Sequence, residues 1–326
     1  MASRLFLTAS KDSSRELTSL FDFVWPTSAA IWNMQWQVKG YRAQMPLATM
    51  DEMGARFLSG SEIRNVNFKQ LEQTSWPDMQ AWFAKLLLSE SCSLFEGWIA
   101  SALDELQVPE SVRKRTTKNS IDKRLQFPST FDDSGAVIGG LQKALTDLHA
   151  PSMSAMMQAS FEVPLVASTK NSKSHVEELL ICYRVFKEAR NCFTHHGGRA
   201  TKTAVDSYTK YSAHTVATLG LKEKPIMPPI VNIGDSIKLE LRGVVGFSDV
   251  VLRLIHTLDA ELAVSSYAET VFCRIWAANQ TIPVRLKSTT SARHSQLKEM
   301  VHQCGLPRPT ALPALDSYMR SKGLVV

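Results

Sequence analysis

The sequence predicts a mainly α-helical protein, a helical bundle with a small β-hairpin insertion and a C-terminal helical appendix. Apolar residues recur at three- and four-residue steps over residues 76–106 and 176–193, a spacing typical of amphipathic helices. Alternation with period two is confined to short stretches. We expect three parts: an N-terminal helical or extended segment (1–70) that packs on the core, a helical domain (70–265) and a small helical appendix (266–326).

The composition is ordinary for a globular protein, with 44% hydrophobic and 21% charged residues among 326. No segment approaches the roughly 18 consecutive apolar residues that span a bilayer, and the first apolar stretch is too short for a secretory signal. We therefore expect a cytoplasmic protein without a membrane partner. The formal net charge of +6 favours a polyanionic partner such as nucleic acid.

Three tryptophans, Trp25, Trp32 and Trp36, lie close together in the N-terminal segment. Apolar and polar residues alternate over residues 32–38, which predicts a short strand. We expect the indole rings to pack in the core, rather than to form a platform on which bases stack.

Residues 75–109 predict one long core helix or two helices in line. Ser75 is a candidate N-cap, and Pro77 falls in the first turn, where its missing N–H costs nothing. The apolar stripe is wide enough to lie in a core, and Pro109 ends the helix. The stripe comprises Met79, Trp82, Phe83, Leu86, Leu87, Phe95, Trp98, Ile99, Ala102 and Leu106.

The densest basic stretch of the chain follows this helix. Six cations fall within twelve residues, with Asp122 the one acid among them. These cations form either a phosphate-contacting surface or a solvated face of the chain. The candidate RNA-binding residues are Arg113, Lys114, Arg115, Lys118, Lys123, Arg124 and, further along the chain, Arg199.

The middle of the chain predicts helices over about residues 136–148 and after Pro151, with turns before them and a polar loop over residues 169–174. Alternating residues predict a small hairpin over residues 231–241. A helix is then expected to begin at Ser248, which is a candidate N-cap.

Two short helices are expected near the C-terminus, over about residues 292–304 and 312–322, the second ended by Gly323. We expect a small appendix that packs on the main domain. The alternative is a helix-turn-helix that binds nucleic acid. Its candidate contacts are Arg293, Lys298, Arg308, Arg320 and Lys322.

The cysteines are scattered singly, without a CxxC pair, so the sequence predicts neither a disulfide framework nor a zinc site. A thiol nucleophile at Cys192 is the alternative to histidine chemistry in the segment described next. The five residues are Cys92, Cys182, Cys192, Cys273 and Cys304.

Residues 175–198 carry the clearest candidate site. The helical ladder through Tyr183 and Phe186 continues to Arg190, so an arginine lies on the apolar stripe of a helix. Burying a guanidinium costs several kcal/mol (roughly) unless an anion compensates it. The anion is either a ligand in a partly enclosed cleft or a carboxylate of the chain. The candidate carboxylates are Glu177, Glu178 and Glu188.

Two histidines, His195 and His196, follow in the last turn, before a Gly-Gly pair that ends the helix. The partial negative charge of a helix C-terminus favours a protonated imidazole, and histidine suits general acid or base catalysis near neutral pH. Asn191 and His195 are four residues apart and share a helix face, so the amide is a candidate to orient the ring. The alternative role of a histidine here is to cap the last carbonyls.

At these residues the sequence resembles the HEPN superfamily (higher eukaryote and prokaryote nucleotide-binding domains). The family's ribonuclease motif is an arginine, often followed by asparagine, and then a histidine after four to six intervening residues. Arg190 and Asn191 precede His195 with this spacing, and His196 fits with one residue more. The resemblance covers about residues 70–265 and is greatest to larger prokaryotic members from phage-defence and toxin operons.

The resemblance implies a metal-independent endoribonuclease without a cofactor, acting on tRNA or mRNA as a homodimer with a composite active site. Arg190 would hold the scissile phosphate and His195 would move a proton, with His196 in reserve. The products would carry 2′,3′-cyclic phosphate and 5′-hydroxyl ends. The alternative is a non-catalytic module that binds RNA or protein; a cognate antitoxin or sensor protein is compatible with either activity.

Overall fold

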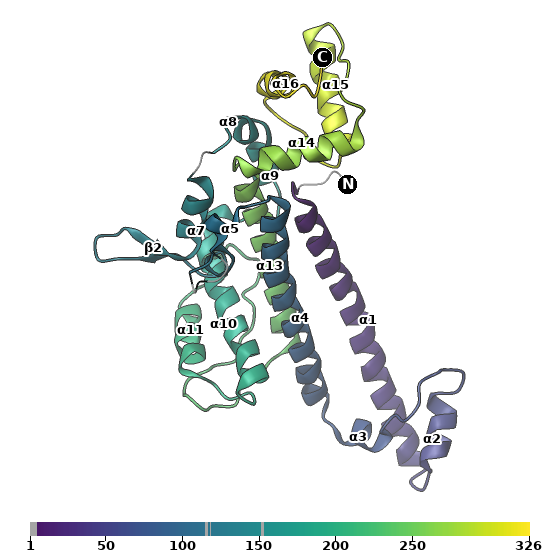
Figure 1. The fold of residues 1–326 in the computed structure, drawn as a ribbon. Helices are drawn as coiled ribbons and strands as arrows, with labels where there is room; N and C mark the ends of the chain where they lie inside the picture. The colour runs from purple at the N-terminus through teal and green to yellow at the C-terminus, as the bar shows by residue number, and fades with distance from the viewer. Residues whose placement is uncertain (1–4, 115–116, 118, 151–152) are drawn as a thin grey trace.

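The computed structural model describes residues 5–114, 117, 119–150 and 153–326, and most of these lie in helices, as the sequence predicts (Figure 1). The elements are α1 (Thr8–Gln44), α2 (Met50–Phe57), α3 (Phe68–Gln73), α4 (Trp76–Glu105), α5 (Glu110–Arg113), α6 (Ile121–Arg124), β1 (Thr130–Phe131), β2 (Val137–Gly139), α7 (Gly140–His149), α8 (Ala155–Met157), the π-helix η1 (Gln158–Glu162), α9 (Val163–Val166), the 3₁₀ helix η2 (Lys173–His175), α10 (Val176–His195), α11 (Lys202–Ser212), α12 (Val216–Leu219), α13 (Leu241–Ala263), α14 (Tyr267–Asn279), α15 (Thr290–Gln303) and α16 (Leu312–Ser321).

The long helices form a layered bundle. Helices α4 and α13 lie at its centre, with α1 along one side and α10 and α11 along the other (Figure 1). Helices α2 and α3 lie at one end of α1, and α14–α16 lie at the opposite end of the bundle. In the part of the chain that the structure describes, no helix is long and apolar enough to cross a membrane.

A stack of aromatic rings joins the three helices that position the candidate site. The ring of Tyr183 on α10 lies 4.7 Å from Phe95 on α4 and 5.9 Å from Phe247 on α13. Phe186, one turn further along α10, stacks on Phe247 at 4.6 Å. These four rings are fully buried, so the interior fixes the middle of α10.

The core helix that begins at Ser75 is confirmed, with one difference along its stripe. Ser75 caps α4 by accepting the Asp78 N–H at 3.2 Å. The C-terminal half of the stripe is buried, but Trp82 and Leu86 in the N-terminal half are each 69% exposed. The stripe therefore continues beyond the core onto the surface.

The strand expected over residues 32–38 is wrong, because this stretch belongs to α1, which continues through Pro26. Trp25, Trp32 and Trp36 are spaced seven and four residues apart, so they share one helix face, and that face is exposed rather than packed as we expected. An adjacent stripe decides the conformation, because it is buried and repeats at helical spacing. Its buried members are Val24, Ser28, Gln35 and Val38.

The hairpin expected over residues 231–241 is also wrong. The segment is extended, and Ile237 and Leu239 are buried as their alternation predicts, but its partner is the chain just after α10. The Ile237 N–H donates to the Gly198 carbonyl at 2.9 Å, and the Ala200 N–H donates to the Asp235 carbonyl at 2.9 Å. The small sheet of the described chain is instead the antiparallel hairpin β1–β2. Strand β1 lies where the sequence predicts turns, but β2 occupies the first residues of the helix expected over about residues 136–148, and that helix, α7, begins only at Gly140.

Helix α13 begins at Leu241, seven residues before the predicted cap at Ser248. Ser248 lies inside the helix, where its hydroxyl donates to the Val244 carbonyl at 3.1 Å and lies 3.1 Å from the hydroxyl of Ser91 on α4. A serine inside a helix can satisfy its hydroxyl by donating to the carbonyl four residues earlier. Ser248 does so, and it is therefore an interior residue of α13 and not its N-cap.

The C-terminal helices α15 and α16 lie where the sequence predicts them, and Gly323 follows α16 with a positive φ of 67°. Helix α14 was not predicted; its Phe272 and Trp276 are buried. Asp316 pairs with Arg293 and Arg320, at 2.7 and 2.9 Å, which occupies two of the cations considered for nucleic-acid binding.

The start of α1 is held by carboxylates from other helices. Asp259 on α13, fully buried, accepts the Phe6 and Leu7 N–H groups at 2.7 and 3.0 Å. Glu105 at the end of α4 accepts the Thr8 and Ala9 N–H groups at 3.0 and 2.9 Å. These contacts replace a local N-cap, which Leu7 has no side-chain oxygen to supply.

Asp259 predicts a pH-dependent stability. Burial raises the pKa of its carboxyl from 3.8 to about 6, although the Phe6, Ser10 and Leu7 donors oppose the shift. The folded protein keeps this proton to higher pH than the unfolded chain, so the contribution is fully present below about pH 4 and is lost as pH rises to about 6. We expect this loss to be about 3 kcal/mol in the free energy of unfolding, measured by urea denaturation at several pH values.

The variant Asp259→Asn should lack that component, while Asp12→Asn, at an exposed position, should keep it. Equal pH dependence in wild type and Asp259→Asn would contradict the assignment.

Candidate active site at the end of α10

Helix α10 ends as its sequence predicts. Gly197 and Gly198 follow it with φ values of 58° and 78°, and the Gly198 N–H returns to the Cys192 carbonyl at 2.9 Å. Positive φ is accessible to glycine at little cost, so the pair stops the helix and turns the chain toward the extended segment described above. His195 and His196 are both exposed at this end.

Arg190 lies at the contact between α10 and α4. Its guanidinium is 19% exposed, and Nη2 donates to Oε1 of Glu96 at 2.7 Å. A carboxylate of the chain therefore compensates the charge of Arg190, which was one of the two alternatives from the sequence. This carboxylate belongs to α4 and is none of the three candidates on α10. Glu177 accepts from Ser129, and Glu188 pairs with Arg184.

Glu96 serves two cations at once. The Lys187 ammonium reaches the same Oε1 at 2.7 Å, and the Tyr183 hydroxyl lies 3.5 Å away. Burial is the largest single effect on Arg190 and lowers its pKa, but the charge of Glu96 and the contacts with Cys92 and Tyr183 together outweigh it, so the pKa is raised. Two cations on one carboxylate leave a net positive charge in a partly buried place, which favours a further anion.

The guanidinium of Arg190 also has an unused donor. Among the atoms of the described residues, its Nε is buried and has no hydrogen-bond partner. This N–H is sealed from solvent, so an incoming oxygen would reach it only after the guanidinium turns, and it would then be stabilised because a buried N–H without a partner is costly.

The pairing of Asn191 with His195 stays a prediction. Asn191 is half-buried, and within the described ranges no side-chain hydrogen bond joins it to His195. The side chain of Thr194 turns back along the helix and donates to the Arg190 carbonyl at 3.0 Å.

An apolar surface lies beside Phe193, which precedes His195 by two residues in α10. Because α4 and α10 pack against each other, Lys85 on α4 places its ammonium 4.7 Å from the ring of Phe193 and 5.9 Å from that of Trp82. Trp82 and Leu86 are exposed beside them. Exposed apolar side chains grouped in this way are typical of an interaction surface.

The cysteines near the site are structural. Cys92 is buried beside Arg190, and burial raises the pKa of its thiol to about 12. Cys192 is also fully buried, with its Sγ 3.8 Å from the Thr201 hydroxyl. Neither sulfur is open to a substrate, which disfavours the alternative of a thiol nucleophile.

The basic stretch is divided in space. Arg113 is buried, and its guanidinium is bound by Asp104 and by Asp122, the latter at 2.7 Å. Lys114, Lys123 and Arg124 line a cavity on the other side of the bundle. Arg115 and Lys118 lie outside the described residues. Arg199 is exposed beyond the end of α10 and donates to the Gly234 carbonyl at 3.3 Å. A role of these residues in RNA binding stays a prediction.

The sequence reasoning missed Glu96 and Lys187. Glu96 carried a usable signal, because it lies four residues after Cys92 and three before Ile99, on the buried face of α4. An acid on the apolar face of one helix and an arginine on that of another form a natural pair, but only the fold brings them together.

Groups of His, Cys, Asp and Glu arranged to hold a metal ion are not found among the described residues. Comparisons with protein-family models, curated proteins and solved structures found no match to this chain. The candidate site therefore depends on its own geometry and on the motif.

Replacing Glu96 tests the contact that positions Arg190. Glu96→Gln leaves two cations without their carboxylate, so we expect the free energy of unfolding to fall by about 1–2 kcal/mol, measured by urea denaturation. Glu90→Gln, exposed on the same helix, serves as the control and should change it by less than about 0.5 kcal/mol. Equal effects of the two substitutions would show that the ion pair contributes nothing.

Proposed function

We propose that the chain is a metal-independent endoribonuclease of the HEPN type, with Arg190, Asn191, His195 and His196 as its catalytic group. The observation that carries the proposal is the pair of cations, Lys187 and Arg190, which share the carboxylate of Glu96 and precede two exposed histidines by about two turns and one turn of α10. The matching spacing of the motif supports it, as does the mainly helical fold.

The electrostatics suit a phosphodiester. RNA carries one negative charge per phosphate, and a phosphodiester that approaches Arg190 meets a guanidinium with unused donor capacity. Lys187 can keep Glu96 neutralised while Arg190 turns part of its fork toward the phosphate. Charge that gathers on the non-bridging oxygens in the transition state is then stabilised.

The chemistry needs only proton transfer. A neutral imidazole, with His195 our choice and His196 the reserve, takes the proton of the 2′-hydroxyl as its oxygen attacks phosphorus. The P–O5′ bond breaks, and the leaving oxygen takes a proton from a protonated imidazole. The products are a 2′,3′-cyclic phosphate and a 5′-hydroxyl.

A second copy of the chain would supply the other half of the site. The exposed Trp82 and Leu86 lie on the α4 surface that adjoins Phe193 and the end of α10. A homodimer through this surface would cover apolar side chains and bring two α10 ends together across one cleft. A cognate antitoxin or sensor that covers the same surface is the regulatory partner we propose, as for a toxin or anti-phage effector.

A non-catalytic module that binds RNA or protein is the second candidate. The ion pair between Arg190 and Glu96 favours it, because a guanidinium that already has a carboxylate fulfils a structural role without any substrate. Cleavage therefore decides between the two functions.

Cleavage of total RNA and tRNA in excess chelator is the test of the enzyme. We expect fragments with 2′,3′-cyclic phosphate ends, a loss of about 10²–10⁴-fold in His195→Ala, and a loss of about 10³-fold in Arg190→Lys. Arg190→Lys keeps the charge beside Glu96 but removes the planar fork, so its thermal unfolding should match wild type while its cleavage does not.

His294→Ala, on α15 in the appendix, is the control and should cleave like wild type. Loss in His196→Ala with full activity in His195→Ala would reassign the proton transfer to His196. A folded wild-type dimer that binds RNA without cleaving it would favour the non-catalytic module.

The composite site predicts that dimerisation and cleavage are lost together. Trp82→Arg combined with Leu86→Arg should reduce the mass measured by light scattering from twice 36.3 kDa to 36.3 kDa, and should reduce cleavage at equal protein concentration. Leu47→Arg, 94% exposed and outside this surface, should change neither. A monomeric double variant with full activity would exclude a composite site.

A further inference from the structure

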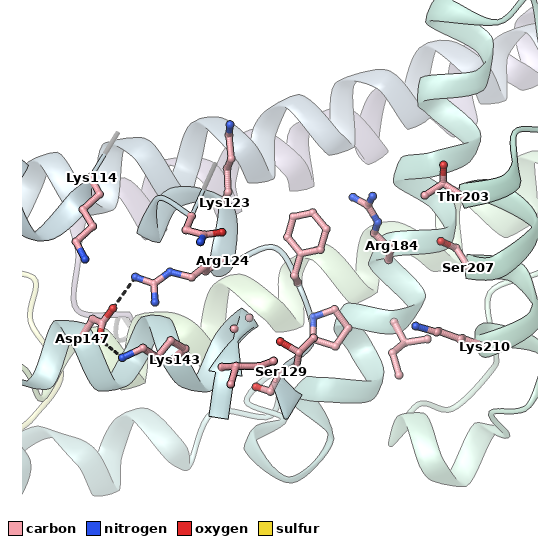
Figure 2. A pocket seen from close by; sticks show the side chains of 18 of the residues that line it. Lys114, Lys123, Arg124, Ser129, Lys143, Asp147, Arg184, Thr203, Ser207 and Lys210 are labelled. Atoms are coloured by element: carbon pink, nitrogen blue, oxygen red, sulfur yellow. Dashed lines mark hydrogen bonds and ion pairs between the residues drawn. The ribbon is translucent and has the colours of Figure 1, made fainter. Parts of the chain in front are cut away.

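A large basic cavity lies on the side of α10 that faces away from Arg190. Its walls come from α6, the hairpin, α7, α10 and α11, and its volume is about 1120 Å³ (Figure 2). Ile181 of α10 lines it, nine residues before Arg190, which is about two and a half turns and therefore the opposite face of the helix. The cavity is thus separate from the candidate active site.

The side chains that line the cavity carry an excess of positive charge. Six cations, against the two carboxylates of Asp147 and Asp206, come from five parts of the fold. They are Lys114, Lys123, Arg124, Lys143, Arg184 and Lys210. Figure 2 shows the three lysines Lys114, Lys123 and Lys210 on different sides of this space, and in the described chain none of the three ammonium groups has an ion-pair or hydrogen-bond partner.

The other three cations are held in place by carboxylates. Asp147 binds Arg124 at 2.7 Å and Lys143 at 2.8 Å, so one carboxylate again serves two cations. Arg184 pairs with the buried Glu188. Arg124 is only 9% exposed, and its Nε is buried without a partner among the described residues. The cavity therefore contains cations that carboxylates hold in place as well as lysines without such a partner in the described chain.

The cavity also has an apolar wall. Phe127, Ile138 and Ile181 line it, and the guanidinium of Arg184 lies 4.4 Å from the centre of the Phe127 ring. A flat heterocycle packs well on such a surface, while several ammonium and guanidinium groups suit a phosphate. Binding cavities for small molecules typically hold about 300–1,000 Å³, so the space admits a whole nucleotide.

We propose that this cavity binds a nucleotide, with its phosphates held by cations that line the cavity and its base against the apolar wall. The ligand is either a free nucleotide or one nucleotide of an RNA strand, since both present the same phosphate and ring. The proposal does not depend on RNA cleavage, because the cavity lies on the opposite face of α10 from Arg190.

Calorimetric titration of the full chain at about 0.15 M salt tests it, with ATP, adenosine and a short 2′-O-methyl RNA as probes. The methylated RNA lacks the 2′-hydroxyl nucleophile, so binding is measured apart from any cleavage. Lys123→Gln with Lys210→Gln is the test variant, since both side chains are exposed and unpaired in the described structure. Lys202→Gln, exposed on α11 but outside the cavity, is the matched control.

We expect ATP to bind more tightly than adenosine, and the double variant to bind ATP at least about tenfold more weakly while Lys202→Gln does not. The same pattern with the RNA alone would support the strand as the source of the nucleotide. If neither ATP nor the RNA binds, or if the double variant and the control bind ATP with equal affinity, the proposal is overturned. Either result stands whether or not the wild-type chain cleaves RNA.

Discussion

The arrangement of the bundle around its candidate site depends on one carboxylate. Glu96 lies on the buried face of α4 and binds both Lys187 and Arg190, so it fixes the rotation of α10 about its own axis as well as its distance from α4. The aromatic stack through Tyr183 and Phe247 fixes the same helix from the other direction. With both constraints in place, the end of α10 has one position relative to α4, and the exposed histidines follow from it.

Helix α10 connects two different kinds of surface. One face carries Arg190 and ends in the histidines; the opposite face, through Ile181, lines the basic cavity. Each side uses the same electrostatic device, a carboxylate shared by two cations: Glu96 on one face and Asp147 in the cavity. Sharing lowers the cost of holding cations close together while leaving a net positive charge for an incoming anion.

The elements that the sequence predicts correctly are those whose residue pattern lies within a single segment of the chain. The helices at 76–105 and 176–195, the Ser75 cap of the first and the Gly-Gly stop of the second follow from spacing and from residue types at the ends, and the structure has them. The strand predicted at 32–38 is wrong because the segment carries both a two-residue alternation and a helical repeat. The buried residues follow the helical repeat, and they, rather than the tryptophans, determined the conformation. The hairpin failed because the extended segment pairs with residues 198–200, a partner that no local pattern indicates. Glu96, Lys143, Arg184 and Lys210 are close to their sites only through the fold.

The ion pair between Arg190 and Glu96 has to be reconciled with the proposed catalysis. A phosphodiester near Arg190 is repelled by Glu96 unless another cation keeps that carboxylate neutral, and Lys187 is bound to the same oxygen. In the absence of RNA, the carboxylate compensates a guanidinium that would otherwise be partly buried and unpaired. When a phosphate arrives, Arg190 can share its donors between the two anions, because its planar fork presents several N–H groups and one of them is unused. A lysine at the same position offers only a point charge and cannot bridge both. On the proposed function, position 190 requires arginine because one side chain has two roles. Some of its N–H donors bind Glu96 and stabilise the fold, and others bind the phosphate and stabilise the transition state.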